Sequence, residues 1–101
     1  MPNFALTLVR GPKWDVSRGG IRDQVMWDEH AAFMDELVAD GTILLGGPVG
    51  DGKQTLHVVE ADDESDVRRR LAEDPWARAR LLEVGSLEPW SLWLDARKLA
   101  R

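Results

Sequence analysis

Hydrophobic and polar positions change their spacing along the chain, and each change marks a predicted element. Residues 3–9 alternate, with one apolar set on each side: Phe4, Leu6 and Leu8 against Ala5, Thr7 and Val9. A period of two is typical of a strand. From about residue 22 or 24 to residue 40, apolar residues recur at helical spacing: Trp27, Ala31, Met34 and Val38. Gly41 then supplies the left-handed stop common at helix ends, so this pattern predicts a helix.

Two short strands with a glycine-rich connection are predicted in the middle of the chain. Residues 42–45 and 55–60 have strand composition and are joined by turn residues: Gly46, Gly47, Pro48, Gly50, Asp51 and Gly52. We therefore predict a hairpin. Gly47 to Lys53 also spells G-x-x-x-x-G-K, but a phosphate-binding loop needs Ser or Thr next and then a helix. Gln54 and a strand follow instead, so we assign the glycines to hairpin geometry and exclude nucleotide binding there.

A second helix and a last strand complete the order. Asp62 or Asp63 can cap this helix, which we expect to stop near Asp74, just before a proline. Three segments follow it: a helical turn over residues 75–81, an extended segment over residues 82–94 and a basic tail over residues 95–101. Pro89 favours an edge or a bulge in the extended segment.

The resulting order, β-α-β-β-α-β, is that of the ferredoxin-like fold. In that fold, right-handed crossovers place both helices on one face of a four-stranded antiparallel sheet, so we predict an α+β protein. The strands carry apolar residues on both faces, so the uncovered face would be apolar too: Phe4, Leu6 and Leu8 against Ala5 and Val9, Leu44 against Ile43 and Leu45, and Trp90, Leu92 and Leu94 against Trp93. An exposed apolar patch on the order of several hundred Å² requires a partner. A homodimer that packs sheet against sheet is the simplest cover.

Composition narrows the class of protein. A chain of 101 residues suits one compact domain, so we expect a single domain over residues 1–101 with its core in residues 3–94. Cysteine is absent, which excludes disulfides, thiolate metal sites and a cysteine nucleophile. The net charge of -5 argues against a nucleic-acid partner. No window approaches the ~20 apolar residues of a membrane span, so we expect a soluble cytoplasmic protein without a membrane partner.

His30 and Asp74 are the strongest candidates for chemistry. On a helical wheel that starts at Trp27, His30 lies inside the apolar arc, at about 300°. Asp74 lies on the core-facing stripe of the second helix if that helix reaches it. A buried imidazole and a buried carboxylate each cost on the order of several kcal/mol when unpaired, and pairing them offsets that cost. We therefore expect a hydrogen bond or ion pair between them.

Two interpretations of this pair follow. In the structural interpretation the pair satisfies itself and locks the two helices together, and spacing alone slightly favours this. In the functional interpretation Asp74 fixes the tautomer of His30, whose other nitrogen moves a proton at a substrate. The substrate would then meet two apolar walls and two residues near the entrance: Trp27 and Trp76, and Arg10 and Trp14.

The remaining polar residues have weaker signals. The loop over residues 10–22 is long for this size, which favours a cover over a site, and Ser17 in it has no positive sign of a Ser-His-Asp triad. His57 alternates with Leu56 and Val58, so we expect it to face away from them, toward the dimer interface, as a structural histidine. His30 and His57 lie on different elements, so we expect no metal, and we expect no cofactor.

Five arginines form a local basic cluster after the second helix begins: Arg68, Arg69, Arg70, Arg78 and Arg80. Such a cluster can attract an anionic ligand. A solvated helix face with ion pairs is the better interpretation, because Glu64, Asp66 and Glu73 lie at helical spacing from these arginines.

Four segments together resemble the YCII-related family: W-D-E-H-A-A-F-M-D-E-L from Trp27, L-L-G-G-P-V from Leu44, D-P-W from Asp74 and E-P-W from Glu88. The likeness extends from the first strand to residue 94. It implies a ferredoxin-like fold and dimers of the α+β barrel type. It also implies that the first-helix histidine and the aspartate of D-P-aromatic form the proposed active-site pair, here His30 and Asp74.

The resemblance also implies a kind of chemistry. Relatives of related fold include dehydrochlorinases and lactone isomerases that act on small ring compounds. We therefore hypothesise a small-molecule enzyme, lyase-like or isomerase-like, that transfers protons through His30 and Asp74 on an unknown substrate. The alternative is a non-catalytic dimeric module that binds a ligand or a protein and uses the pair only to dock its helices.

Overall fold

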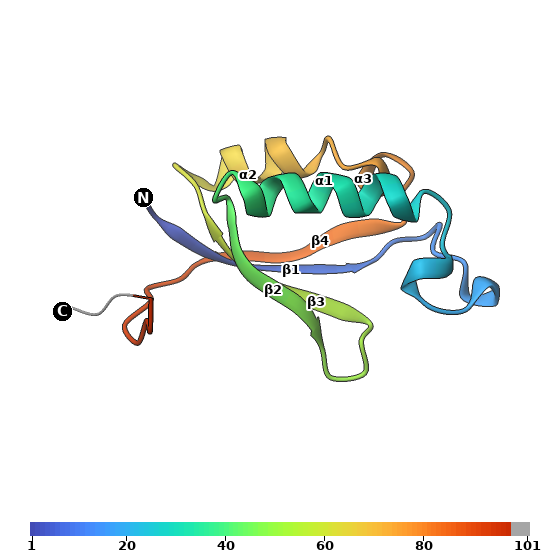
Figure 1. Ribbon diagram of the computed structural model, residues 1–101, viewed down its shortest axis with the longest axis horizontal. Coiled ribbons are helices and arrows are strands. Elements are labelled where there is room, and N and C mark those ends of the chain that lie inside the picture. The colour runs from blue at the N-terminus through green and yellow to red at the C-terminus, as the bar shows by residue number, and fades with distance from the viewer. Residues whose placement is uncertain (98–101) are drawn as a thin grey trace.

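The computed structural model describes residues 1–97. Its elements keep the predicted order, with two 3-10 turns added in the first loop: β1 (Asn3–Arg10), η1 (Val16–Arg18), η2 (Ile21–Asp23), α1 (Trp27–Ala39), β2 (Ile43–Val49), β3 (Gln54–Glu60), α2 (Glu64–Leu71), α3 (Pro75–Arg78) and β4 (Leu82–Pro89). The strands form one antiparallel sheet in the order β2-β3-β1-β4. The predicted α+β, ferredoxin-like fold is therefore confirmed (Figure 1). The last four positions of the predicted basic tail lie outside the described residues.

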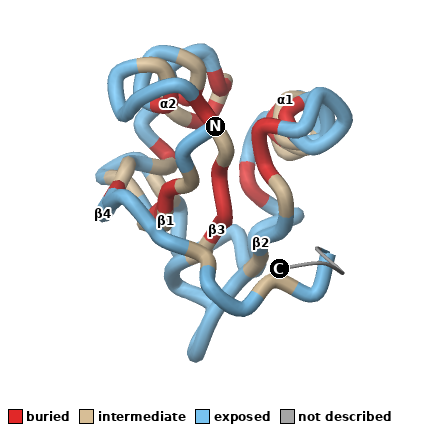
Figure 2. Tube along the Cα trace, turned by 90° about the vertical axis from the view of Figure 1, so that its left-hand side faces the viewer, coloured by how far each residue is buried: buried red, intermediate tan, exposed pale blue. Residues whose placement is uncertain are grey.

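Helices α1 and α2 lie side by side over one face of the sheet (Figure 2). Phe4, Leu6 and Leu8 of β1 are buried beneath them, whereas the alternate residues of β1 belong to the other face. Residues from the neighbouring elements complete the core: Leu37, Ile43, Val59, Val67, Leu71 and Leu87. Burying one such side chain stabilises the fold by roughly 1.5–3 kcal/mol, so this layer between helices and sheet holds the domain together.

Helix α1 begins later and faces the core differently than the pattern predicted. It starts at Trp27, because Met26 before it adopts a left-handed φ of 59° that no α-helix continues through. Val38, predicted in the core, is 54% exposed, whereas Leu37 and His30 are buried. Apolar side chains flank the buried face on both sides, so the helical wheel alone did not locate its centre.

We expected the second helix to end near Asp74, in the D-P-W segment. This segment instead begins a third helix. Helix α2 is capped by Asp63, whose side chain accepts from the Asp66 N–H, and it ends at Leu71. Asp74 is the N-cap of α3, and its carboxylate accepts from the Trp76 N–H at 2.9 Å. Pro75 explains the difference: it disfavours helical geometry at Asp74 and suits the first position of a new helix.

The predicted hairpin is present, and β2 runs further into the glycine-rich segment than expected. β2 includes Gly46 and ends at Val49, so only residues 50–53 form the turn. A Cβ on Gly46 would lie 2.2 Å from Nδ1 of His57. Glycine is therefore required there, because the imidazole packs directly against the β2 backbone. At the other end of the sheet, β4 stops at Pro89 and not at residue 94.

The loop over residues 10–22 is tied to the body of the protein. The Gly11 N–H donates to the Leu81 carbonyl at 2.8 Å, next to the start of β4. Gln24 is buried and bonds twice to Asp15, accepting from its N–H at 3.0 Å and donating to its carbonyl at 2.7 Å. These bonds hold the loop at one end of α1 and of the sheet (Figure 1).

Two of the three predicted arginine ion pairs are present. Arg68 pairs with Glu64, and Arg69 pairs with Asp66, both within α2. Arg70 turns away from Glu73 to Asp40 and Thr42, at the end of α1. It therefore links the two helices, a contact between distant parts of the chain that local spacing does not reveal.

The uncovered sheet face is partly apolar, as the strand pattern predicted, although Ile43 belongs to the core. Leu45 is 60% exposed there. It borders a groove of about 310 Å³ whose other apolar lining residues come from β2, β3 and the end of β4: Pro48, Val49, Leu56, Val58 and Trp90. Among the described residues, no helix is long and apolar enough to cross a membrane.

Candidate active site

His30 and Asp74 form a buried pair between α1 and the start of α3. Nδ1 of His30 lies 3.0 Å from Oδ1 and 2.9 Å from Oδ2 of Asp74. The two residues are 6% and 3% exposed. An ionised carboxylate only accepts hydrogen bonds, so Nδ1 carries the proton in this contact. In the neutral imidazole, Nε2 is then the unprotonated nitrogen.

Trp76 fixes the plane of the imidazole. Its indole is completely buried and stacks on His30, with centroids 3.9 Å apart and planes 6° from parallel. The indole N–H donates to the Val25 carbonyl at 2.7 Å. Trp27 and Trp14 pack against Trp76 in turn, at centroid distances of 5.8 and 5.7 Å. The Trp76 indole therefore supports one face of the His30 ring, and Trp14 and Trp27 hold that indole in place.

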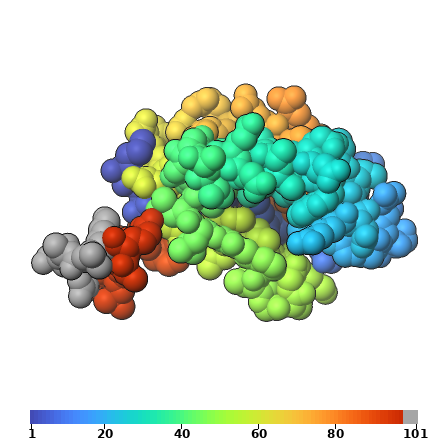
Figure 3. Space-filling view, in the orientation of Figure 1, coloured from blue at the N-terminus to red at the C-terminus, as the bar shows by residue number. Residues whose placement is uncertain are grey.

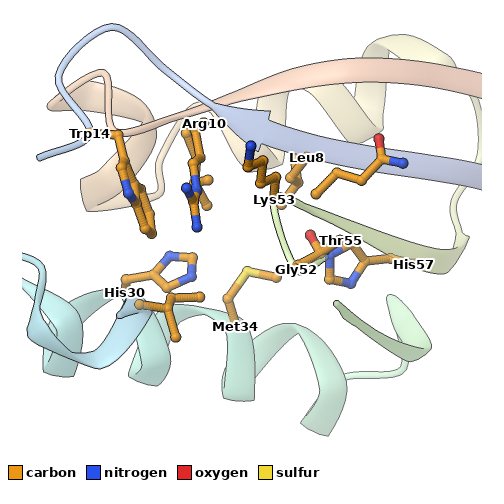
Figure 4. A pocket seen from close by; sticks show the side chains of 12 residues that line it. Leu8, Arg10, Trp14, His30, Met34, Gly52, Lys53, Thr55 and His57 are labelled. Atoms are coloured by element: carbon orange, nitrogen blue, oxygen red, sulfur yellow. The ribbon is translucent and has the colours of Figure 1, made fainter. Parts of the chain in front are cut away.

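A cavity of about 70 Å³ lies between α1, β1 and the β2–β3 hairpin, and His30 is on its wall (Figure 4). The molecular surface is hollowed between α1 and the hairpin (Figure 3). Six of the lining residues have polar side chains: Arg10, His30, Lys53, Gln54, Thr55 and His57. The other six are mainly apolar: Leu8, Trp14, Ile21, Met34, Gly52 and Leu82.

The cavity brings together only some of the residues predicted for it. Arg10 and Trp14 line it, and the Arg10 guanidinium lies 4.6 Å from the Trp14 ring centroid. Trp27 and Trp76 do not line it. The Trp76 ring is stacked on His30 at 3.9 Å, which leaves no space for a ligand between these two rings. Asp74 borders a separate apolar hollow of about 180 Å³.

His57 faces the helix layer and not the uncovered face that we predicted for it. In the sheet it pairs with Leu6, whose side chain lies fully inside the core. Its Nε2 lies 2.8 Å from the Thr55 hydroxyl. Burial, and then repulsion from a charged His30, lower the pKa of His57 below its ordinary 6.5. The alternation with its neighbours was predicted correctly, but alternation does not say which face is covered.

Lys53 and Thr55 are cavity residues that sequence reasoning missed. Lys53 was noticed only within the G-x-x-x-x-G-K run, whose last four residues form the hairpin turn. The Asp51 carboxylate accepts from the Lys53 N–H at 2.9 Å and fixes the turn. No local pattern gives the direction of the hairpin, so the approach of Lys53 to β1 had no signal in the sequence.

Other chemistry has little support in the site. The Ser17 hydroxyl bonds to Asp15 at 2.6 Å in the exposed η1 turn, and Ser17 does not line the cavity. Within residues 1–97, no group of three or more His, Cys, Asp or Glu side chains is arranged to hold a metal ion. The indole N–H of Trp14 is buried and has no hydrogen-bond partner among residues 1–97.

The fold and the paired histidine and aspartate define a small α+β protein with a site between its helices and sheet. The YCII-related domain family matches residues 16–91, so the chain belongs to that family. Among solved structures it is similar to a 5-chloro-2-hydroxyhydroquinone dehydrochlorinase, TftG, from Burkholderia phenoliruptrix AC1100 in complex with 2,5-dihydroxybenzoquinone. The identity is 22%, the TM-score 0.58, and the match covers 87% of this chain and 93% of that one. A comparison with curated proteins gives no match.

Proposed function

We propose that this protein is a small-molecule enzyme in which His30 is the general acid and base and Asp74 orients it. One observation carries the proposal: the imidazole is held by a buried carboxylate on one nitrogen and forms part of a cavity wall. A pair that only docked the helices would not require a cavity beside the imidazole. The dehydrochlorinase of similar fold supports a lyase-like or isomerase-like reaction, with the substrate of this chain still to be found.

The proposed chemistry uses the nitrogen that Asp74 leaves available. Nε2 of His30 removes a proton from a carbon or hydroxyl of the substrate, and the Asp74 carboxylate stabilises the resulting imidazolium. In a lyase reaction the electrons of the broken C–H bond form a double bond, and the leaving group departs with its own pair. In an isomerase reaction the imidazolium returns the proton to another atom. Trp76 keeps the ring plane fixed throughout.

A substitution that preserves the hydrogen bond tests this proposal. His30→Asn keeps an N–H that can donate to Asp74, but it has no group that titrates near neutral pH. With 5-chloro-2-hydroxyhydroquinone and 2,5-dihydroxybenzoquinone as first probes, we expect chloride release or ring deuterium uptake by the wild type. We expect the reaction rate to fall by at least about 100-fold in His30→Asn, because a general base typically contributes that much to the rate. Equal rates in two equally stable proteins would contradict the role of His30.

A second experiment needs no substrate. Diethyl pyrocarbonate acylates an accessible, unprotonated imidazole nitrogen, and mass spectrometry locates the product. We expect His30 to react through Nε2 from the cavity. A folded protein in which His30 stays unmodified would favour the alternative of a non-catalytic binding module, in which the pair only docks α1 onto α3.

We further propose that the protein is a cytoplasmic homodimer whose subunits pack through their uncovered sheet faces. The exposed apolar residues around the groove beside Leu45 support this arrangement, because such a patch is unfavourable in water. The absence of cysteine suits a reducing compartment. The dimer is the state in which we expect the enzyme to work.

A further inference from the structure

All charged residues that line the cavity are basic. Of its twelve lining residues, Arg10 and Lys53 are basic, His30 and His57 are imidazoles, and none is Asp or Glu. The chain as a whole has 18 acidic residues against 13 basic ones, so an acid-free lining is not the average surface of this protein. Within residues 1–97, neither Arg10 nor Lys53 forms an ion pair.

We infer that the cavity binds the anionic group of a small organic substrate, a carboxylate or an ionised enol or phenol, between Arg10 and Lys53. The inference rests on the proposed function of His30 and adds the class of substrate to it. Two cations that share a partly enclosed space repel each other, and an anion between them relieves that repulsion. A planar oxyanion also suits the fork of N–H donors on a guanidinium.

The arginine is already oriented for such a ligand. Arg10 is the last residue of β1, and its guanidinium packs over the Trp14 ring at 4.6 Å from the centroid. This contact with an aromatic face fixes the group without using up its hydrogen-bond donors. In Figure 4 the Arg10 side chain extends from β1 toward His30 on α1. The donors are therefore available to an acceptor within the cavity.

The lysine comes from a turn with a fixed backbone. Gly50 and Gly52 adopt left-handed φ angles of 60° and 83°, which glycine allows without strain. With the Asp51 bond to the Lys53 N–H, they define where the lysine side chain starts. Arg10 and Lys53 then lie on the β1 and hairpin side of the cavity, across from His30 (Figure 4). Negative charge that develops when His30 removes a proton would face these cations, which stabilises it.

The size of the cavity limits what enters. An engineered protein cavity of about 150 Å³ binds benzene, and this one has about 70 Å³. The charged end of a small acid therefore fits inside, and a ring attached to it would extend out of the cavity. We accordingly expect single-ring or short-chain acids, and no nucleotide or large cofactor.

A matched pair of probes tests the charge requirement. Benzoate and benzamide have nearly the same shape, but only benzoate is an anion. In calorimetric titrations of the wild type we expect benzoate to bind at least about tenfold more tightly than benzamide. We expect added salt to weaken benzoate binding, because it screens the cations. Equal affinities for the two probes, or no binding of benzoate, would overturn the inference.

Three variants locate the anion and separate this inference from the proposed function. Lys53→Met and Arg10→Gln should each weaken benzoate binding by about tenfold, the effect of one charge-assisted hydrogen bond. Lys13→Met, which removes the same charge from an exposed position outside the cavity, should leave it unchanged, and an equal effect of Lys13→Met would contradict the site. His30→Asn should still bind benzoate. Selective benzoate binding with unchanged catalysis in His30→Asn would therefore reject the role of His30 and keep the anion site.

Discussion

The imidazole of His30 lies flat on the indole of Trp76, with ring centroids 3.9 Å apart and planes within 6° of parallel. The relationship follows from three consecutive residues. Asp74 bonds to both His30 and the Trp76 N–H, and Pro75 between them starts α3. The same turn therefore brings a carboxylate to the edge of the imidazole and an indole to its face. Within that turn, the D-P-W motif supplies both supports of the candidate base.

We expect Trp76→Phe to destabilise the protein by roughly 2 kcal/mol. The smaller ring leaves a void in a fully buried position, and the Val25 carbonyl loses its donor. Urea unfolding measures the change in the free energy of unfolding. The control is Val16→Ala, at a position 82% exposed, which should change that free energy by less than about 0.5 kcal/mol. Similar values for both variants would argue against the buried support role.

Asp74 should tolerate asparagine better than alanine. Asp74→Ala removes the cap of α3 and leaves the His30 N–H without an acceptor, so we expect a loss of about 3 kcal/mol. Asp74→Asn retains a side-chain oxygen for one of these bonds, and we expect about half that loss. Chemical denaturation of both variants checks the order. If asparagine cost as much as alanine, the negative charge itself, and not hydrogen bonding, would hold the site together.

Gly46 and Gly47 are neighbours, but we expect only Gly47 to tolerate substitution by alanine. A Cβ on Gly46 would meet His57 at 2.2 Å and the Leu56 carbonyl oxygen at 2.9 Å, whereas a Cβ on Gly47 meets nothing within 4 Å. We expect Gly46→Ala to lower stability by about 2 kcal/mol through overpacking, and Gly47→Ala to be close to neutral. Thermal unfolding distinguishes them. Partial recovery in the Gly46→Ala, His57→Ala double variant would trace the clash to the imidazole.

The lowered pKa of His57 predicts a loss of stability in mild acid. The unfolded chain binds a proton to this residue below about pH 6.5, whereas the folded protein resists it because of burial and repulsion from His30. The contribution of His57 is therefore complete above about pH 6.5 and declines as the pH falls toward the lower folded pKa. Urea unfolding across this range should show a shallower decline in His57→Gln than in the wild type. Parallel curves for the two proteins would contradict the burial argument.

We expect the uncovered sheet face to form a dimer interface, and a single carboxylate placed in it to disrupt the dimer. Leu45 is 60% exposed in the single chain, so Leu45→Asp should leave the fold intact and place a carboxylate in the proposed interface. Light scattering after size exclusion should give a dimer for the wild type and a monomer for the variant. Val16→Asp, in the exposed η1 turn, is the control and should stay dimeric. A monomeric wild type would reject the proposed arrangement.

Some properties of this protein follow from its sequence alone, because they depend on local chemistry. Alternation grouped Phe4, Leu6 and Leu8 on one face of β1, and the turn residues placed the hairpin. The contact between His30 and Asp74 was predictable too, since two polar groups in apolar stripes are costly until they meet. Asp74 before Pro75 could either end one helix or begin the next. The sequence identified the residue as important but did not decide between these two positions.

Only the tertiary structure decided what surrounds the pair. Alternation in a strand separates two faces without saying which one the helices cover, so His57 was assigned to the wrong face. A helical wheel does not say how far a helix is rotated over a sheet, and Val38 was misplaced for that reason. Trp76 supports the imidazole and Lys53 reaches the cavity because of the direction of two turns, and this direction is determined by packing among elements distant in the chain.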